Sequence, residues 1–169
     1  MVHNSPLVSV SMICYNAEAF IAESIESILN QKVDFPIELV IGDDCSKDNT
    51  RQICETYAEK YPEIIRLLLP ENNLGIGGNT ARTMGSCRGK YIAVCDGDDI
   101  WIDPHKLKRQ VDFLEQNPHY GVVYTDVETV SETGACIFLG IGRVLRATRP
   151  KRRPPSQRLC VGELTKSRH

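Results

Sequence analysis

The feature that most constrains the fold is a regular alternation of short, mainly apolar segments with longer amphipathic ones. The apolar segments are rich in valine, isoleucine and leucine, which is typical of strands that are buried on both faces of a sheet. We predict strands at residues 7–13, 37–41, 64–69, 91–95 and 121–124. Strands of this kind, separated by helical segments, predict an α/β fold with a mostly parallel central sheet.

Four helices are predicted among these strands. The first begins at Ala17, with Asn16 as its N-cap, and carries a single stripe of isoleucines at helical spacing. The others are predicted at residues 48–61, at 75–88, and after Asp103, which caps the last one. A turn at 132–134 is predicted between two further extended pieces. We expect the helices to cover both faces of the sheet.

Composition and charge divide the chain into a domain and a tail. The chain has 169 residues, of which 41% are apolar, enough for the core of one domain. Its net charge of −2 is unevenly spread. Residues 143–169 carry nine Lys and Arg and one acid, whereas residues 1–142 carry 11 basic and 21 acidic residues. We therefore predict a folded domain at 1–142 and a basic, proline-containing tail at 143–169 that is poorly ordered or unrelated to the domain.

The sequence argues against several locations and partners. No apolar run approaches the ~20 residues that a membrane-spanning helix needs, and the first residues lack a basic segment followed by an apolar one. The seven cysteines are odd in number and contain no Cys-x-x-Cys pair, so we expect free thiols. The basic tail has no interleaved aromatic residues. We expect a cytoplasmic protein with at most peripheral membrane association and no nucleic-acid partner.

Three polar clusters follow predicted strands at their carboxyl ends, which is where open α/β sheets bind ligands. The clusters are Cys14-Tyr15-Asn16, Gly42-Asp43-Asp44-Cys45-Ser46 and Asp96-Gly97-Asp98-Asp99. If the strands follow the order 3-2-1-4, the first and fourth strands flank the crevice. All three clusters would then converge on one pocket.

The last cluster is the most informative, because its three closely spaced carboxylates repel one another unless a cation compensates. Mg²⁺ and Mn²⁺ prefer carboxylate oxygens and often share their site with phosphates. Alternatives remain open for each cluster. The cluster at 96–99 can be a solvated acidic turn, Asp43 and Asp44 can cap a helix rather than bind a base or ribose, and Tyr15 can pack rather than stack on a base.

Taken in this order, the clusters resemble those of the family 2 glycosyltransferases. The matching segments are residues 8–16, 38–50, 73–75 and 89–99, followed by Trp101, Pro104, Lys106 and Leu107. The resemblance implies a Rossmann-like GT-A nucleotide-binding fold. It also implies an inverting transfer of a sugar from a nucleotide-diphospho-sugar donor to a hydroxyl of a saccharide or lipid-linked acceptor, in polysaccharide biosynthesis.

The resemblance implies roles for side chains that follow the first two strands. By position, Tyr15 would stack near the base of the nucleotide. Asp44 would hydrogen-bond the base, and Asp43 is a second candidate for contact with the donor. These three residues are therefore predicted to bind the nucleotide sugar.

The cluster after the fourth strand matches the Asp-x-Asp motif of the family. The resemblance implies that Asp98 lies on the ribose side and that Asp99 binds the metal, Mn²⁺ or Mg²⁺, which bridges the diphosphate. Asp96 is a further candidate for contact with the donor. The metal would act as a Lewis acid on the departing nucleoside diphosphate.

The chain departs from the family in two places. The helix after Gly75 reads Asn79-Thr80-Ala81-Arg82, where the family usually has Ala-Arg-Asn. Past about Gly142 nothing matches the family's second half, which supplies the acceptor pocket and the catalytic base, so we expect a truncated domain and assign no base. Asp126 and Glu128 are available carboxylates without a supporting motif. Two other functions remain open: a nucleotide-diphosphate-binding module without turnover, and a nucleotidyltransferase.

Overall fold

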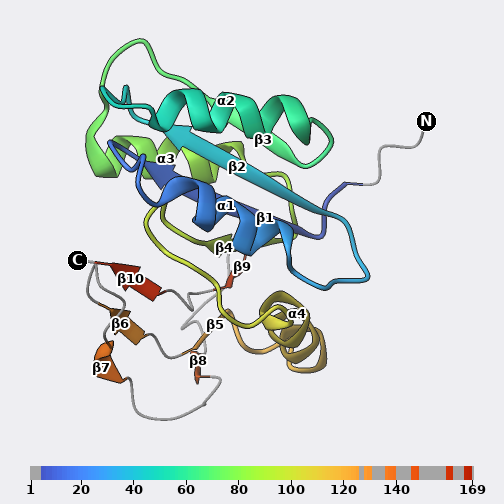
Figure 1. Ribbon diagram of the computed structural model, residues 1–169. Coiled ribbons are helices and arrows are strands. Elements are labelled where there is room, and N and C mark those ends of the chain that lie inside the picture. Colours follow the sequence, from blue (N-terminus) through green and yellow to red (C-terminus); the bar gives the residue numbers. More distant parts are fainter. Residues whose placement is uncertain are drawn as a thin grey trace.

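The computed structural model describes residues 5–125 continuously, together with the backbone of five later strands (Figure 1). These strands are β6 (Glu128–Val130), β7 (Cys136–Leu139), β8 (Arg146–Thr148), β9 (Leu159–Val161) and β10 (Lys166–Arg168). The predicted turn at 132–134 lies outside the described residues, as does most of the predicted tail. The domain boundary at 142 therefore stays a prediction.

Four parallel strands form the centre of the main sheet, in the order β3-β2-β1-β4 (Figure 1). They are β1 (Val8–Cys14), β2 (Ile37–Asp43), β3 (Ile65–Leu68) and β4 (Tyr91–Val94). This is the 3-2-1-4 order that the sequence argument required, and the parallel pairing confirms the predicted α/β class. The central strand β1 has its neighbours on both sides, and its Val8, Val10 and Met12 are fully buried.

The sheet continues past β4 through three further strands, in the order β9-β5-β8. β9 pairs in parallel with β4 and with β5 (Val122–Tyr124), and β8 pairs antiparallel with β5. A second, three-stranded sheet has the order β10-β6-β7. The main sheet is thus mostly parallel, with one antiparallel strand at its edge.

Helices cover both faces of the sheet, as predicted. They are α1 (Ile21–Leu29), α2 (Thr50–Lys60), α3 (Gly75–Ser86) and α4 (Lys106–Gln116). Successive residues of β2 point to opposite faces of the sheet. Leu39 and Ile41 pack in the large core with the isoleucines of α1, whereas Val40 packs with Cys87 and Ile92 on the other face. On the second face, a Cβ added to Gly42 would lie 2.2 Å from Thr83 Oγ1, so α3 sits directly against β2.

Two of the predicted helix starts are wrong. The first helix begins at Ile21 rather than at Ala17, and Asn16 does not cap it. Asn16 instead adopts a left-handed conformation, with φ of 51°, and its Oδ1 accepts a hydrogen bond from Lys47 N at 2.7 Å. The last helix begins at Lys106 with His105, not Asp103, at its N-cap position. The carboxylate of Asp103 accepts a hydrogen bond from His105 N in the turn that precedes the helix.

A buried carboxylate joins β1, β2 and the segment that leads into β4 at the amino end of the sheet. Glu38 of β2 is 2% exposed, and its carboxylate accepts hydrogen bonds from Ser9 Oγ at 2.5 Å, Arg88 N at 2.7 Å and Arg88 Nε at 2.9 Å. Burial by itself would raise the pKa of Glu38, but these hydrogen bonds and the Arg88 charge outweigh burial and lower the pKa below 4.5. The folded state therefore favours the ionised form of the Glu38 carboxyl group.

This lowered pKa predicts a pH dependence of stability. The stabilisation from ionised Glu38 is fully present above the unfolded-state pKa of about 4.5 and is lost as the pH falls through the lower folded-state pKa. We expect Glu38→Gln to be less stable than the wild type at pH 7, and the difference to narrow toward pH 3. Urea unfolding across this range measures it, with a substitution of the exposed Glu59, Glu59→Gln, as control. A difference that is constant with pH would contradict the prediction.

Candidate functional site

The carboxyl ends of β1, β2 and β4 are joined by backbone hydrogen bonds. Asp44 N donates to the carbonyl of Cys14 at 3.0 Å, and Gly97 N donates to the carbonyl of Ile13 at 2.9 Å. The three polar clusters predicted from the sequence therefore follow strand ends that lie together at one edge of the sheet. We call the segment from Asp96 to Asp99 the acid loop.

Asp43 is buried within the turn that follows β2. It is 1% exposed, and its carboxylate accepts hydrogen bonds from both the hydroxyl and the backbone N–H of Ser46. The thiol of Cys14 also points at Asp43 Oδ1, at 3.9 Å. These contacts give Asp43 a role in shaping the turn, whatever else it contacts.

Cys14 carries no sign of an activated nucleophile. It is 6% exposed, and its hydrogen bond with Cys54 and its burial raise the pKa of the Cys14 thiol far above the ordinary range. A thiol that stays protonated neither attacks a substrate nor binds a metal as thiolate. The described cysteines are all free, as the sequence predicted.

Asp44 connects the end of β2 to the loop that enters α3. It is 3% exposed, its Oδ1 accepts a hydrogen bond from Leu74 N at 2.8 Å, and its carbonyl accepts one from Asn73 Nδ2 at 2.8 Å. Gly75 then follows with a φ of +69°, a conformation that glycine adopts without strain. The structure thus explains why the motif at 73–75 accompanies the acids at 43–44.

Tyr15 presents its ring to solvent at the rim of this region. The residue is 50% exposed, although its neighbour Asn16 is fastened through its backbone N–H to Ser46 Oγ at 2.9 Å. An exposed aromatic ring on a fixed backbone offers a flat apolar surface to a ligand at little cost in conformational entropy. The alternative role for Tyr15 was packing within the domain, and packing covers only half of the surface of this residue.

The acid loop forms a tight turn after β4. Asp99 N donates to the carbonyl of Asp96 at 3.1 Å, and Cys95 Sγ lies 3.7 Å from the carbonyl oxygen of Asp99. Asp99 is 6% exposed, whereas Asp96 and Asp98 are partly exposed. Carboxylates of this kind fit a hard divalent cation. Within the described residues, however, no three His, Cys, Asp or Glu side chains gather into a group that could hold a metal.

The sequence argument missed a set of polar side chains on α1 and just after its end. Ser24 Oγ donates to the carbonyl of Gly97 at 2.9 Å, Ser27 Oγ accepts from Trp101 N at 3.1 Å, and Gln31 Nε2 donates to the carbonyl of Asp103 at 2.9 Å. All three side chains are buried. The available signal was the spacing of three residues between Ser24 and Ser27, which places them on one face of α1, with Gln31 two residues past the end of that helix.

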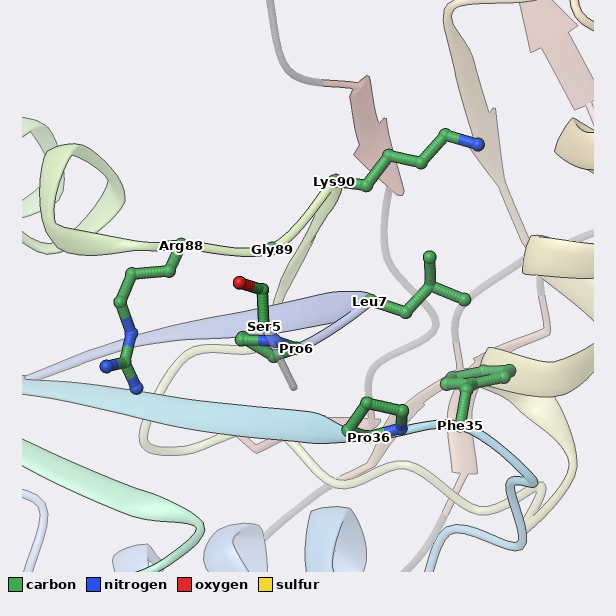
Figure 2. Close-up of a pocket in the computed structure, with 8 residues that line it drawn as sticks. All are labelled: Ser5, Pro6, Leu7, Phe35, Pro36, Arg88, Gly89 and Lys90. Atoms are coloured by element: carbon green, nitrogen blue, oxygen red, sulfur yellow. The ribbon is translucent and has the colours of Figure 1, made fainter. Parts of the chain in front are cut away.

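A groove of about 690 Å³ lies at the other end of the sheet. Leu7, Phe35 and Pro36 line it, with Arg88 and Lys90 at its sides, as Figure 2 shows. These residues precede β1, β2 and β4 in the chain, whereas the polar clusters follow the same strands. The groove is therefore separate from the candidate site.

Within the described part of the chain, no helix has the length and apolar character needed to cross a membrane.

Known sequences resemble this chain over most of its length. The sequence model of the family described as Glycosyl transferase family 2 matches residues 9–159. EpsE of Bacillus subtilis, a protein named as a glycosyltransferase, is 40% identical over 132 residues, which are 78% of this chain and 47% of EpsE. The chain spans between 37% and 47% of the length of the first curated relatives that it matches.

Solved structures share the fold. TarS residues 1–349 of S. aureus in complex with UDP-GlcNAc is 29% identical, with a TM-score of 0.61 over 80% of this chain and 37% of that chain. The mannosyltransferase PcManGT from Pyrobaculum calidifontis, in complex with GDP-Man and Mn²⁺, has a TM-score of 0.61 at 24% identity, over 76% of this chain and 36% of that chain. The first similarity confirms the predicted GT-A fold. Because the family model matches residues 9–159, which are most of the chain, this chain belongs to glycosyl transferase family 2.

Proposed function

We propose that this chain binds the donor in an inverting, metal-assisted transfer of a sugar from a nucleotide-diphospho-sugar to an acceptor hydroxyl. The observation that carries the proposal is the junction of three strand ends, which brings the acid loop of β4 beside the cluster that holds Tyr15 and the cluster that holds Asp44. Support comes from TarS, which was crystallised with UDP-GlcNAc. The acceptor would be a saccharide or a lipid-linked molecule.

We assign the base of the nucleotide to the side of the site formed by β1 and β2. The half-exposed ring of Tyr15 would stack on the base. Asp44 uses Oδ1 to hold Leu74 N, which leaves Oδ2 as the atom that we assign to the base. Asp43 would support this contact indirectly, because its hydrogen bonds with Ser46 fix the turn that carries Asp44.

We assign the ribose and the diphosphate to the acid loop. Asp98, which is partly exposed, would face the ribose, and Asp99 would hold Mn²⁺ or Mg²⁺, with Asp96 as a further contact. When bound, the cation would offset the negative charge that the departing nucleoside diphosphate gains. The few carboxylates of the loop leave room for diphosphate oxygens and water as further ligands.

The reaction itself is a single displacement at the anomeric carbon. The acceptor oxygen would form its bond on the face opposite the diphosphate, the bond from carbon to the diphosphate oxygen would break, and the acceptor proton would pass to a carboxylate base. We assign no base, and Asp126 and Glu128 lie outside the side chains that the structure describes. The role of this chain is to bind and orient the donor.

Metal-dependent donor binding is the direct test. We expect calorimetric titration of the chain with a panel of nucleotide sugars, including UDP-GlcNAc and GDP-mannose, to give saturable binding in Mn²⁺ that is lost in chelator. Equal binding in chelator would overturn the metal role, and no binding to any member would overturn the donor site. If turnover is observed with an acceptor, release of pyrophosphate instead of nucleoside diphosphate would indicate a nucleotidyltransferase.

A further inference from the structure

We propose that Ser24 and Ser27 of α1, and Gln31 just after it, are positioning residues, which hold the acid loop in the conformation that receives the cation and diphosphate. The inference rests on the proposed function of the acid loop. It assigns to α1 a role beyond covering the sheet, since these side chains contact the backbone that follows β4. We call the three residues the polar stripe.

The contact of Ser24 is the most direct. Ser24 is fully buried, and its Oγ lies 2.9 Å from the carbonyl oxygen of Gly97. That carbonyl belongs to the peptide group whose nitrogen is Asp98 N, so the bond sets the plane from which Asp98 and then Asp99 project. On the other side of Gly97, its N–H donates to the carbonyl of Ile13 at 2.9 Å. Gly97 is therefore fixed from α1 and from β1 at once.

The remaining contacts hold the segment that follows the acid loop. Ser27 Oγ accepts from Trp101 N at 3.1 Å, Gln31 Nε2 donates to the carbonyl of Asp103 at 2.9 Å, and Gln31 Oε1 accepts from Leu107 N at 3.1 Å. Each partner is a backbone group. The stripe therefore ties the chain at intervals from the acid loop to the start of α4, where the loop would otherwise be free to open.

Packing alone does not account for the polar stripe. A buried hydroxyl or amide costs free energy unless it is hydrogen-bonded, and an alanine or a leucine would fill a helix–sheet contact without that cost. The two serine hydroxyls also donate to backbone carbonyls of their own segment, of Phe20 at 3.2 Å and of Ser24 at 2.7 Å. The other partners of the stripe are backbone groups of the segment from Gly97 to Leu107, which have no strand ladder of their own to satisfy them. Removing a group that is hydrogen-bonded to a metal-binding side chain changes metal affinity by about 10- to 100-fold, and the stripe acts one step further out, on the backbone that carries the acids, so we expect an effect toward the lower end.

The test compares Ser24→Ala with Ser9→Ala. Ser9 is also fully buried and hydrogen-bonded, through Glu38 and the N–H groups of Arg88 and Gly89, but it lies at the opposite end of the sheet. Both variants should lose stability. We expect only Ser24→Ala to weaken Mn²⁺ binding in the presence of UDP or GDP, by about tenfold or more. The electron paramagnetic resonance of free Mn²⁺, recorded on folded protein, measures it.

A second readout requires no ligand. In the unliganded chain we expect Ser24→Ala to speed amide hydrogen exchange at Asp98 and Asp99, and Ser9→Ala to leave these amides unchanged. Ser27→Ala provides an independent variant of the stripe, with the same expectation, if Ser24→Ala does not fold. Unchanged exchange and unchanged Mn²⁺ binding in a stripe variant would overturn the inference, as would equal effects in Ser9→Ala. Failure of the wild type to bind Mn²⁺ would instead overturn the proposed function, and the exchange data would still decide whether the stripe holds the loop.

Discussion

Asp99→Asn is expected to abolish the metal-dependent binding of nucleotide sugars. The substitution keeps the shape of the side chain but replaces a carboxylate oxygen with an amide nitrogen, which carries protons and no charge and does not ligate a hard cation. Asp99 is 6% exposed at the end of a tight turn, so an isosteric residue keeps the backbone contacts of the loop. Calorimetric titration with Mn²⁺ and the best donor of the panel measures the loss.

Two variants make this result specific. Asp112→Asn removes the same charge from α4, where Asp112 pairs with Lys108 at 2.6 Å, and should leave donor binding unchanged. Asp98→Asn should weaken donor binding but keep its dependence on Mn²⁺, because Asp98 is assigned to the ribose. Donor binding by Asp99→Asn at the wild-type level would remove Asp99 from the metal site. If Asp98→Asn lost the dependence on Mn²⁺ and Asp99→Asn kept it, the metal would be assigned to Asp98 instead.

The sheet was predictable because its strands are short segments rich in valine, isoleucine and leucine. In β1, Val8, Val10 and Met12 are buried on one face, and Ser9 and Ser11 are buried on the other, so β1 is an interior strand, as the 3-2-1-4 order requires. The helix starts were less predictable. Asn16 has the side chain of an N-cap, but asparagine also tolerates the left-handed conformation, and only the approach of Lys47 decides which use is made of it.

The location of the acids was predictable, whereas their surroundings were not. Asp43 and Asp44 were expected to contact a ligand. The structure buries both, and Ser46 donates a hydrogen bond to Asp43 while Leu74 donates one to Asp44. Leu74 lies 30 residues further along the chain, so no local pattern reports the contact. The polar stripe was missed for a similar reason. Polar residues on a helix usually indicate a solvent face, and its partners arrive more than 70 residues later.

Gly97→Ala is the second change with a large expected effect, on both folding and binding. A Cβ on Gly97 would lie 2.7 Å from the Cβ of Cys14, 3.0 Å from Ile21 Cδ1 and 3.3 Å from the carbonyl oxygen of Ile13. The Cβ of Cys14 is attached directly to the backbone of β1, so a rotamer change does not relieve the contact. We expect a loss of about 3 kcal/mol in the free energy of unfolding, the upper end of the usual cost of overpacking.

The same displacement should reach the site, because Gly97 carries both bonds that fix the acid loop, to Ile13 and to Ser24. Gly85→Ala is the matched control: nothing lies within 4 Å of a Cβ at that helical position, so alanine should stabilise the fold by about 0.5–1 kcal/mol through a smaller entropy loss. Urea unfolding and Mn²⁺-dependent titration measure both effects. If Gly97→Ala kept wild-type stability and binding, the carboxyl ends of β1 and β4 would be able to move apart without cost. The close contact of β1 with the acid loop would then have no part in donor binding.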